Sequence, residues 1–181
     1  MADKSIKNTG KEQGFVLWLT GLSGAGKSTI ARAVAEGLER MGRKVERLDG
    51  DVMRSIFPGT GFTRQEREEH IKRIGFMASR LEHHGVVVVA SFISPYRQSR
   101  QAVREMCKNF IEVYVRASLE TCRKRDVKGL YKKALAGEIQ NFTGIDDPYQ
   151  QPEKPEVIVD TDALSPQQSV ESIMACIRPF M

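Results

Sequence analysis

Continuous hydrophobic runs alternate along the chain with segments of helical spacing. The run at residues 15–20 ends at a glycine-rich turn, which is typical of a buried strand. The run at residues 86–92 begins with four valines, and this indicates a strand covered on both faces, as in a parallel sheet. Shorter runs predict three more strands, at residues 44–48, 110–115 and 157–160.

Between these strands, apolar side chains recur every three or four residues, which predicts helices. Residues 94–107 form another predicted helix, whereas residues 53–65 hold a proline and two glycines and are expected to be irregular. Ser165 and Gln168 have the spacing of a helix N-cap. The apolar positions of the two clearest helices are Ile30, Val34, Leu38 and Met41 in the first, and Ile71, Ile74, Ala78 and Leu81 in the second.

This alternation predicts an α/β fold around a parallel sheet, whose ligands bind beyond the carboxyl ends of the strands. The composition suits one domain: of 181 residues, 40% are hydrophobic and 28% charged, which excludes a disordered chain, a collagen-like repeat and a coiled coil. We expect residues 1–14 to be a flexible arm and residues 15–181 a single domain. The net charge of +5 fits an anionic small substrate, a nucleic acid or good solubility, and does not choose among them.

The spacing of the cysteines and the hydropathy of the chain indicate in which cellular compartment the protein is expected. Cys107, Cys122 and Cys176 are widely spaced and form no CxxC pair, which argues against a disulfide framework and against a zinc site. Reduced thiols in a cytoplasmic protein are the simpler interpretation. Because no apolar run approaches the ~18 residues of a membrane span and the first residues are polar, we expect neither a membrane partner nor a signal peptide.

A phosphate-binding loop follows the first predicted strand. Residues 21–28 match the pattern G-x-x-x-x-G-K-[ST] completely, between a predicted strand and a predicted helix. Glycines let successive backbone N–H groups point at phosphate oxygens, and the helix start adds its positive end. Lys27 would neutralise the outer phosphates and the Ser28 hydroxyl would ligate Mg²⁺, so the sequence predicts binding of a nucleoside triphosphate with magnesium.

Two carboxylates and an arginine follow the second predicted strand. Asp49, Asp51 and Arg54 stand at the edge of the sheet that faces the phosphate-loop crevice. Carboxylates there can hold the magnesium shell or accept a proton from an attacking hydroxyl, and the arginine can hold an anionic acceptor. A polar turn is the competing interpretation, since Asp-Gly is a common turn dipeptide.

Two further segments are more specific than the phosphate loop, which is widespread. They are Phe-Ile-Ser-Pro-Tyr at 92–96 and Lys-Gly-Leu-Tyr-Lys-Lys-Ala at 128–134. In combination with the phosphate loop, these segments resemble the adenylylsulfate kinase family. The resemblance covers roughly residues 14–175. It implies a P-loop NTPase three-layer fold, nucleotide-kinase-like, with a mainly parallel five-stranded sheet and a lid at about residues 126–151. The segments that carry it are 21–28, 49–54, 61–67, 71–75, 91–97 and 125–146.

The family resemblance implies transfer of the ATP γ-phosphate to the 3′-hydroxyl of adenylyl sulfate, which gives 3′-phosphoadenylyl sulfate. ATP and Mg²⁺ would be the cofactors, with Ser28 and Asp49 at the metal, and a homodimer is expected by analogy. The ATP side would consist of Gly21, Leu22, Ser23, Gly24, Ala25, Gly26, Lys27, Ser28, Thr29 and Arg125. The adenylyl sulfate side would consist of Asp49, Asp51, Arg54, Phe62, Arg67, His70, Ile93, Ser94, Lys128 and Phe142.

The resemblance also suggests individual roles. Arg54 and Arg67 would hold the phosphosulfate, because a guanidinium binds such groups in a bidentate manner. Phe62 and Phe142 would stack the substrate adenine, although both could instead be loop anchors and Arg67 could be a solvated charge. His70 departs from the asparagine that many family members carry, which puts one substrate hydrogen bond in doubt.

Two mechanisms are open for the catalytic residues Ser94, Asp51 and Lys27. Family descriptions mark the serine at position 94 as a phosphoserine intermediate, but the sequence offers no adjacent base to activate it. We favour direct in-line transfer, in which Asp51 positions or deprotonates the 3′-hydroxyl and Lys27 stabilises the developing charge.

Other function classes use the same phosphate loop. A regulatory GTPase needs Asn-Lys-x-Asp after a late strand, which the sequence lacks. A kinase with a nucleoside or shikimate-like acceptor is the first alternative. The second is an NTP-dependent nucleic-acid-binding or switch protein. Because the basic residues are scattered and aromatic residues are only 7%, we expect no nucleic-acid partner.

Overall fold

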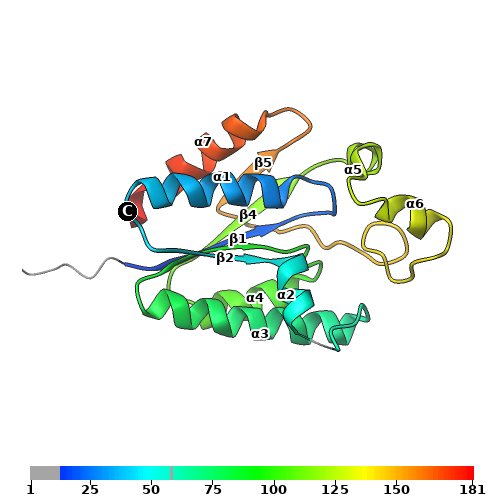
Figure 1. Cartoon of the computed structure of the whole chain (residues 1–181), viewed down its shortest axis with the longest axis horizontal. Helices are drawn as coiled ribbons and strands as arrows, with labels where there is room; N and C mark the ends of the chain where they lie inside the picture. Colours follow the sequence, from blue (N-terminus) through cyan, green and yellow to red (C-terminus); the bar gives the residue numbers. More distant parts are fainter. Residues whose placement is uncertain (1–12, 58) are drawn as a thin grey trace, which may run out of the picture.

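The computed structural model describes residues 13–57 and 59–181, so the predicted N-terminal arm lies almost wholly outside the described residues. Five parallel strands form one sheet in the order β2-β3-β1-β4-β5, and the predicted parallel α/β fold is confirmed (Figure 1). The strands are β1 (Phe15–Thr20), β2 (Val45–Asp49), β3 (Val87–Ser91), β4 (Phe110–Arg116) and β5 (Val157–Asp160).

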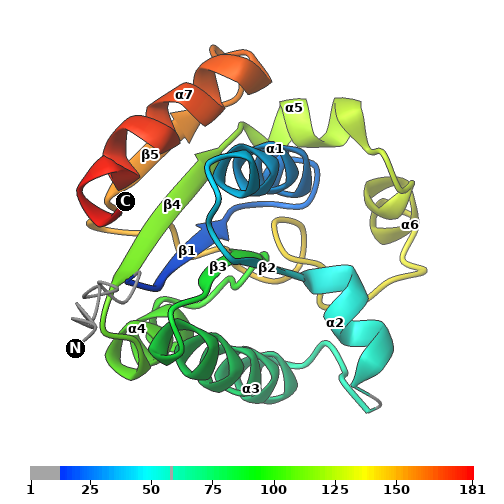
Figure 2. The same ribbon diagram turned by 60° about the vertical axis from the view of Figure 1, so that its left-hand side comes forward.

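Helices cover both faces of this sheet and so make three layers. Helices α1 and α7 lie on one face, α3 and α4 lie on the other, and α5 and α6 lie beyond one end of the sheet (Figures 1 and 2). In the described ranges, no helix is both long and apolar enough to cross a membrane. The helices are α1 (Lys27–Arg40), α2 (Gly50–Ile56), α3 (Arg64–His83), α4 (Arg97–Met106), α5 (Leu119–Arg125), α6 (Leu130–Leu135), α7 (Pro166–Ile177) and the 3₁₀ turn η1 (Arg178–Phe180).

The central strand β1 supplies side chains to two separate cores. Phe15, Leu17 and Leu19 pack with α1 and α7, whereas Val16 and Trp18 pack with α3 and α4. All five are fully buried, because successive strand residues point to opposite faces and both faces carry helices. This two-sided burial explains why the strand is a continuous apolar run in the sequence.

The prediction of irregular structure at residues 53–65 is partly wrong. Helix α2 extends into this range and α3 begins within it. The Asp49 carboxylate accepts the Asp51 N–H at 3.0 Å and caps α2. Thr63 and Glu66 form a capping box that starts α3. Both caps satisfy N–H groups that the first turn of a helix leaves unpaired.

Two other predicted helix features need correction. The helix expected from Ser94 begins at Arg97, because Ser94 has φ 39° and the Pro95 carbonyl accepts a hydrogen bond from Gln150 N–H at 2.8 Å. Met41, expected on the buried face of α1, is 56% exposed, since α1 ends one residue earlier. The predicted capping box at the start of α7 is confirmed.

Candidate active site

The phosphate loop joins β1 to α1 and bends sharply at its glycines. Gly26 caps α1 with φ 100°, a conformation in which a side chain would be strained. Gly21 lies against β4, where an added Cβ would stand 2.3 Å from the carbonyl oxygen of Val115. The loop therefore presents the N-terminus of α1 at the carboxyl end of the sheet, which is a favourable place for phosphate.

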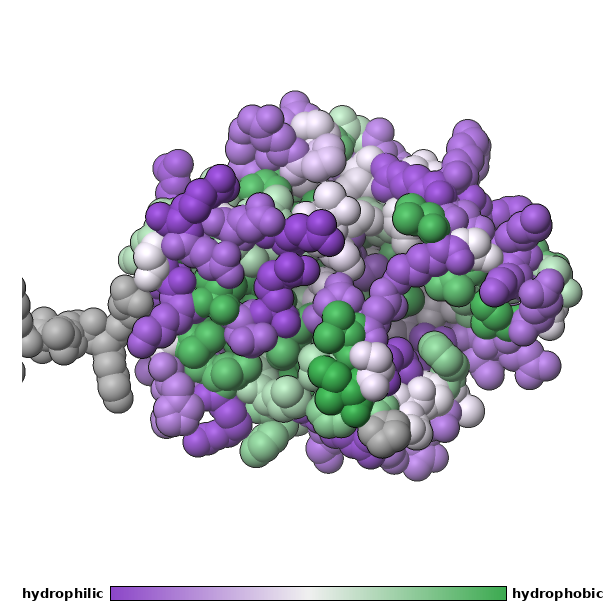
Figure 3. All heavy atoms as spheres, in the orientation of Figure 1, coloured by the Kyte–Doolittle hydropathy of each residue, from purple (hydrophilic) through white to green (hydrophobic). Residues whose placement is uncertain are grey.

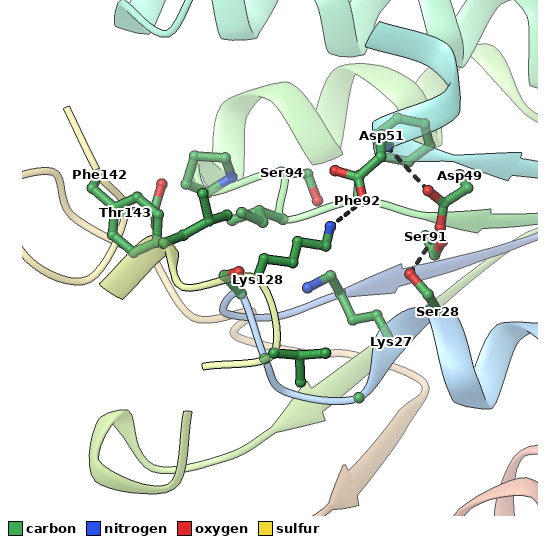
Figure 4. A pocket seen from close by; sticks show the side chains of 18 of the residues that line it. Lys27, Ser28, Asp49, Asp51, Ser91, Phe92, Ser94, Lys128, Phe142 and Thr143 are labelled. Carbon is green, nitrogen blue, oxygen red and sulfur yellow. Dashed lines mark hydrogen bonds and ion pairs between the residues drawn. The ribbon is translucent and has the colours of Figure 1, made fainter. Parts of the chain in front are cut away.

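The Lys27 amino group points into the cavity that this loop borders (Figure 4). It donates a hydrogen bond to the carbonyl oxygen of Leu22 at 2.8 Å, and the residue is only 9% exposed. Burial lowers the pKa of Lys27 from its ordinary value of 10.5 to about 8. A bound phosphate chain would raise this pKa again, because a nearby negative charge favours the protonated amine.

Asp49 connects three elements at the base of the cavity. One carboxylate oxygen, Oδ2, accepts hydrogen bonds from the Ser28 hydroxyl at 2.8 Å and from the Ser91 hydroxyl at 2.9 Å (Figure 4). Burial by itself raises the pKa of Asp49, but the hydrogen bonds from Ser28, Ser91 and the start of α2 outweigh it and lower the pKa. The carboxylate is therefore ionised and faces the Ser28 hydroxyl, a pair of hard oxygen donors.

Asp51 lies in the first turn of α2 and faces across the cavity. Its carboxylate forms an ion pair with the Lys128 ammonium, which comes from the segment between α5 and α6 (Figure 4). Figure 4 also shows that the Lys27 and Lys128 side chains end in the same part of the cavity. Two cations and a carboxylate therefore meet at the point where the phosphate loop opens.

Two guanidinium groups lie close to an exposed aromatic ring on the other side of the cavity. The Arg54 guanidinium carbon lies 4.7 Å from the centroid of the Phe62 ring, and that of Arg67 lies 5.5 Å from it. Phe62 is 55% exposed and lines the cavity. Burial and the neighbouring Arg67 lower the pKa of Arg54. Two cations close to one aromatic ring suit an anion attached to a planar base.

The segment at residues 126–151, here called the lid, is tied to both sides of the cavity. Arg67 of α3 donates to the Thr143 hydroxyl at 3.1 Å and also to the Asn141 carbonyl. The Tyr131 hydroxyl donates to the carbonyl of Ser23 in the phosphate loop at 3.0 Å. Phe142 packs edge-on against Tyr131, with ring centroids 4.9 Å apart. The lid thus bridges the phosphate loop and the two-arginine side.

His70 is a buried cavity residue without a hydrogen-bond partner. It is 1% exposed, and neither ring nitrogen has a partner among the described residues. Its ring lies edge-on to Phe57 and to Phe92, at centroid distances of 6.2 and 6.1 Å. Burial, aided by Arg54, lowers the pKa of His70 to about 4, so the imidazole is neutral at neutral pH. A neutral imidazole in this position can both donate to and accept from a ligand.

Ser94 follows β3 and is held by hydrogen bonds on several sides. Its hydroxyl accepts from the Trp18 indole N–H at 3.1 Å and donates to the Thr20 hydroxyl at 3.1 Å. Thr20 in turn donates to the Ile93 carbonyl at 2.7 Å. These partners are neutral, and in the described part of the chain no carboxylate or imidazole is bonded to the Ser94 hydroxyl.

Arg125 at the end of α5 lies beside the phosphate loop. Its guanidinium donates to the Gly24 carbonyl at 3.3 Å and to the hydroxyl and carbonyl of Thr161 at 3.0 and 2.7 Å. It lines the same cavity, which has a volume of about 930 Å³, in the upper part of the ~300–1,000 Å³ usual for ligand pockets. The cavity is therefore large enough for more than one small ligand.

Nearly all residues that the sequence singled out line this one cavity. The exceptions are Gly21, Leu22 and Ala25, which belong to the phosphate loop but do not line the cavity. Sequence reasoning missed Thr143, Thr161 and Ser91. Ser91 could have been found, since it ends β3 directly opposite Asp49 in the parallel register.

Comparisons with known proteins show the family of this chain. Residues 13–160 match the family model described as adenylylsulphate kinase. The chain belongs to the adenylylsulfate kinase family. Curated relatives of this family include an adenylyl-sulfate kinase of Synechococcus sp. (strain JA-3-3Ab), which is 52% identical over 92% of this chain and 95% of its own length. A probable adenylyl-sulfate kinase of Aeropyrum pernix is 48% identical over 92% of this chain and 94% of its own.

Solved structures of the same family share the fold. The APS kinase of Mycobacterium tuberculosis, in complex with AMPPNP and APS, is 36% identical with a TM-score of 0.87, covering 91% of this chain and 98% of that one. A hexameric APS kinase from Thiobacillus denitrificans is 34% identical with a TM-score of 0.69, covering 93% of this chain but 29% of that one. The P-loop kinase fold that the resemblance implied is thereby confirmed for this family member.

Proposed function

We propose that this protein transfers the γ-phosphoryl group of ATP to the 3′-hydroxyl of adenylyl sulfate, giving ADP and 3′-phosphoadenylyl sulfate. One observation carries the proposal beyond family membership. A single cavity is bordered on one side by the phosphate loop and on the other by the guanidinium groups of Arg54 and Arg67, both of which lie close to the Phe62 ring. Two anionic adenine nucleotides can therefore meet there with their reacting ends together.

In this mechanism the acceptor oxygen attacks the γ-phosphorus in line with the leaving oxygen of ADP. The bond from the 3′-oxygen to phosphorus forms, the bond from phosphorus to the β,γ-bridging oxygen breaks, and Asp51 takes the hydroxyl proton. Lys27 stabilises the negative charge that develops on the transferred group. Lys128, which pairs with Asp51 in this structure, would contact the phosphates once ATP is bound.

Ser28 and Asp49 are the residues proposed to hold Mg²⁺. The fit rests on their chemistry, since a hydroxyl and an ionised carboxylate 2.8 Å apart offer the hard oxygen ligands that Mg²⁺ prefers. When bound, the ion would neutralise the β- and γ-phosphates. The ATP adenine is assigned to the Arg125 side, where the guanidinium lies beside the phosphate loop.

Direct transfer is favoured over a phosphoserine at position 94. The Ser94 hydroxyl already donates to Thr20 and accepts from Trp18, and neither partner can take up its proton as a base. Ser94 is therefore assigned a positioning role on the acceptor side, together with Ile93, Phe142 and His70.

Mass spectrometry of the product made from ATP and adenylyl sulfate tests the proposed function. A mass gain of one phosphoryl group on adenylyl sulfate, located on the ribose, supports it. ADP release should be measured in parallel with a panel of nucleosides and shikimate-like alcohols. ADP release with one of these acceptors and none with adenylyl sulfate would instead identify a different small-molecule kinase.

The protein is also proposed to form a homodimer in the cytoplasm, by analogy with its family. Exposed hydrophobic side chains support an assembly: Val52 and Ile56 of α2 and Phe76 of α3 are each more than half exposed. Figure 3 shows hydrophobic side chains gathered over these helices among hydrophilic ones. Sedimentation equilibrium measures the mass of the protein in solution, and a monomeric mass at micromolar concentration would contradict the dimer.

A further inference from the structure

A buried arginine lies directly behind the loop at residues 93–97, outside the cavity lining. Arg100 of α4 is 3% exposed and uses all three of its guanidinium nitrogens. Nε donates to Glu112 Oε1 at 2.6 Å, Nη1 to the Ser94 carbonyl at 2.7 Å and Nη2 to the Gln150 carbonyl at 2.7 Å. The planar fork of a guanidinium can hold three such acceptors at fixed angles, which an ammonium cannot.

The two carbonyl acceptors belong to segments that border the site. Ser94 has φ 39°, a conformation that residues other than glycine keep only when their surroundings hold it. Gln150 lies at the end of the lid, and its N–H donates to the Pro95 carbonyl at 2.8 Å. One guanidinium therefore fixes the Ser94 peptide and the returning end of the lid relative to each other.

A contribution to stability does not by itself explain why the charged side chain of Arg100 is buried here. A buried ion pair is often no more stable than well-packed hydrophobic residues of similar volume. Glu112, 8% exposed, balances the charge of Arg100, and Arg104 approaches the same carboxylate at 3.6 Å while also pairing with Glu156 at 2.7 Å. Arg104 thus shares the ionic network but donates to neither Ser94 nor Gln150.

We propose that Arg100, held by Glu112, is a positioning residue for the acceptor substrate. It holds the Ser94 peptide and the end of the lid in the geometry that binds adenylyl sulfate, and it does not touch either nucleotide. This inference rests on the proposed function, because it assigns the 93–97 loop to the acceptor side of the cavity. Loss of Arg100 should weaken binding of the acceptor and spare binding of ATP.

The test replaces the pair by apolar residues, Arg100→Met with Glu112→Leu, so that no unpaired charge stays buried. We expect KM for adenylyl sulfate to rise about tenfold or more, since small displacements of a positioning group have effects of this size. KM for ATP should change less than about twofold. The matched control is Arg104→Met, which removes an arginine of the same helix and network and should leave both KM values unchanged.

Two outcomes would overturn the proposal. One is a folded double variant with the wild-type KM for adenylyl sulfate, and the other is an equal rise in both KM values, which indicates general loosening. If the double variant does not fold, Arg100→Lys serves instead. It keeps the charge beside Glu112 but cannot reach both carbonyls, so the same selective rise is expected. The wild-type protein is assayed with adenylyl sulfate first. A wild-type protein without turnover would contradict the proposed function itself, whereas the two outcomes above contradict only the role of Arg100.

Discussion

The ammonium group of Lys128 and the carboxylate of Asp51 form an ion pair across the mouth of the cavity, joining the lid to helix α2. The two residues are 77 positions apart in the sequence. Both side chains are largely exposed, at 52% and 70%, so solvent screens their attraction. Either residue can therefore leave this pair for another partner, and Lys128 can bind phosphate oxygens instead of Asp51.

Lys128→Met should lower activity far more than stability. Without the ammonium, the transferred phosphoryl group loses one cationic contact, and kcat/KM for ATP should fall about 100-fold. The free energy of unfolding should change by less than about 1 kcal/mol, as for other exposed ion pairs. Lys124→Met is the control, because Lys124 is exposed and pairs with Glu120 within α5. Similar kinetics in the two variants would contradict a role for Lys128.

Asp51→Asn should remove most of kcat while ATP binding is retained. The amide cannot accept the proton of the attacking hydroxyl, and loss of a general base typically costs ~10²–10⁴-fold in rate. Calorimetry with a non-hydrolysable ATP analogue checks binding, and a coupled ADP assay checks turnover. Glu68→Gln, on the outer side of α3 and paired with Arg64, is the matched control. Near-normal turnover of Asp51→Asn would refute its catalytic role.

Ser94→Ala should keep turnover within about tenfold of the wild type if transfer is direct, because its hydroxyl then serves only to position groups. The Trp18 indole N–H loses its acceptor, so the free energy of unfolding should fall by ~1–3 kcal/mol. Urea titration and steady-state kinetics measure the two effects. Ser79→Ala, which removes the hydroxyl of a partly exposed serine of α3, controls for loss of a hydroxyl. A variant that folds but has no turnover would favour the phosphoserine mechanism.

Lys27 should take up a proton when ATP binds at alkaline pH. Burial sets the pKa of Lys27 at about 8 in this structure, so above that pH the amine is mostly neutral, and phosphate binding shifts it back to the charged form. Calorimetry at about pH 8.5, in buffers of different ionisation enthalpy, measures the uptake. Lys27→Met should abolish it. Equal uptake in the variant would assign the proton to another group.

The same group affects the stability of the unliganded protein. The pKa of Lys27 is lower in the folded chain than its ordinary value of 10.5, so the unfolded chain binds more protons between about pH 8 and that value. The destabilising effect of Lys27 is thus complete below about pH 8 and disappears as pH rises toward 10.5. Relative to Lys27→Met, the wild type should gain free energy of unfolding across this range.

Prediction from the sequence worked best where the signal is local. The apolar runs identified β1 and β3, and the glycines of residues 21–28 identified the phosphate loop, because each pattern is complete within a few consecutive residues. It failed at α2, where a short helix follows Asp49 directly. That helix depends on a capping carboxylate which also accepts from Ser28 and Ser91, and these partners come from distant parts of the chain.

The sequence by itself determined the parallel sheet, the nucleotide loop and the set of charged residues at the strand ends. Only the tertiary structure decided how these charges are shared: Arg67 reaches the lid at Asn141 and Thr143, Lys128 pairs with Asp51, and Arg100 joins Ser94 to Gln150. The physical reason is that a hydrophobic run in the sequence indicates which residues are buried, but not which residues contact them. The partner of a buried guanidinium is chosen by the packing of elements far apart in sequence.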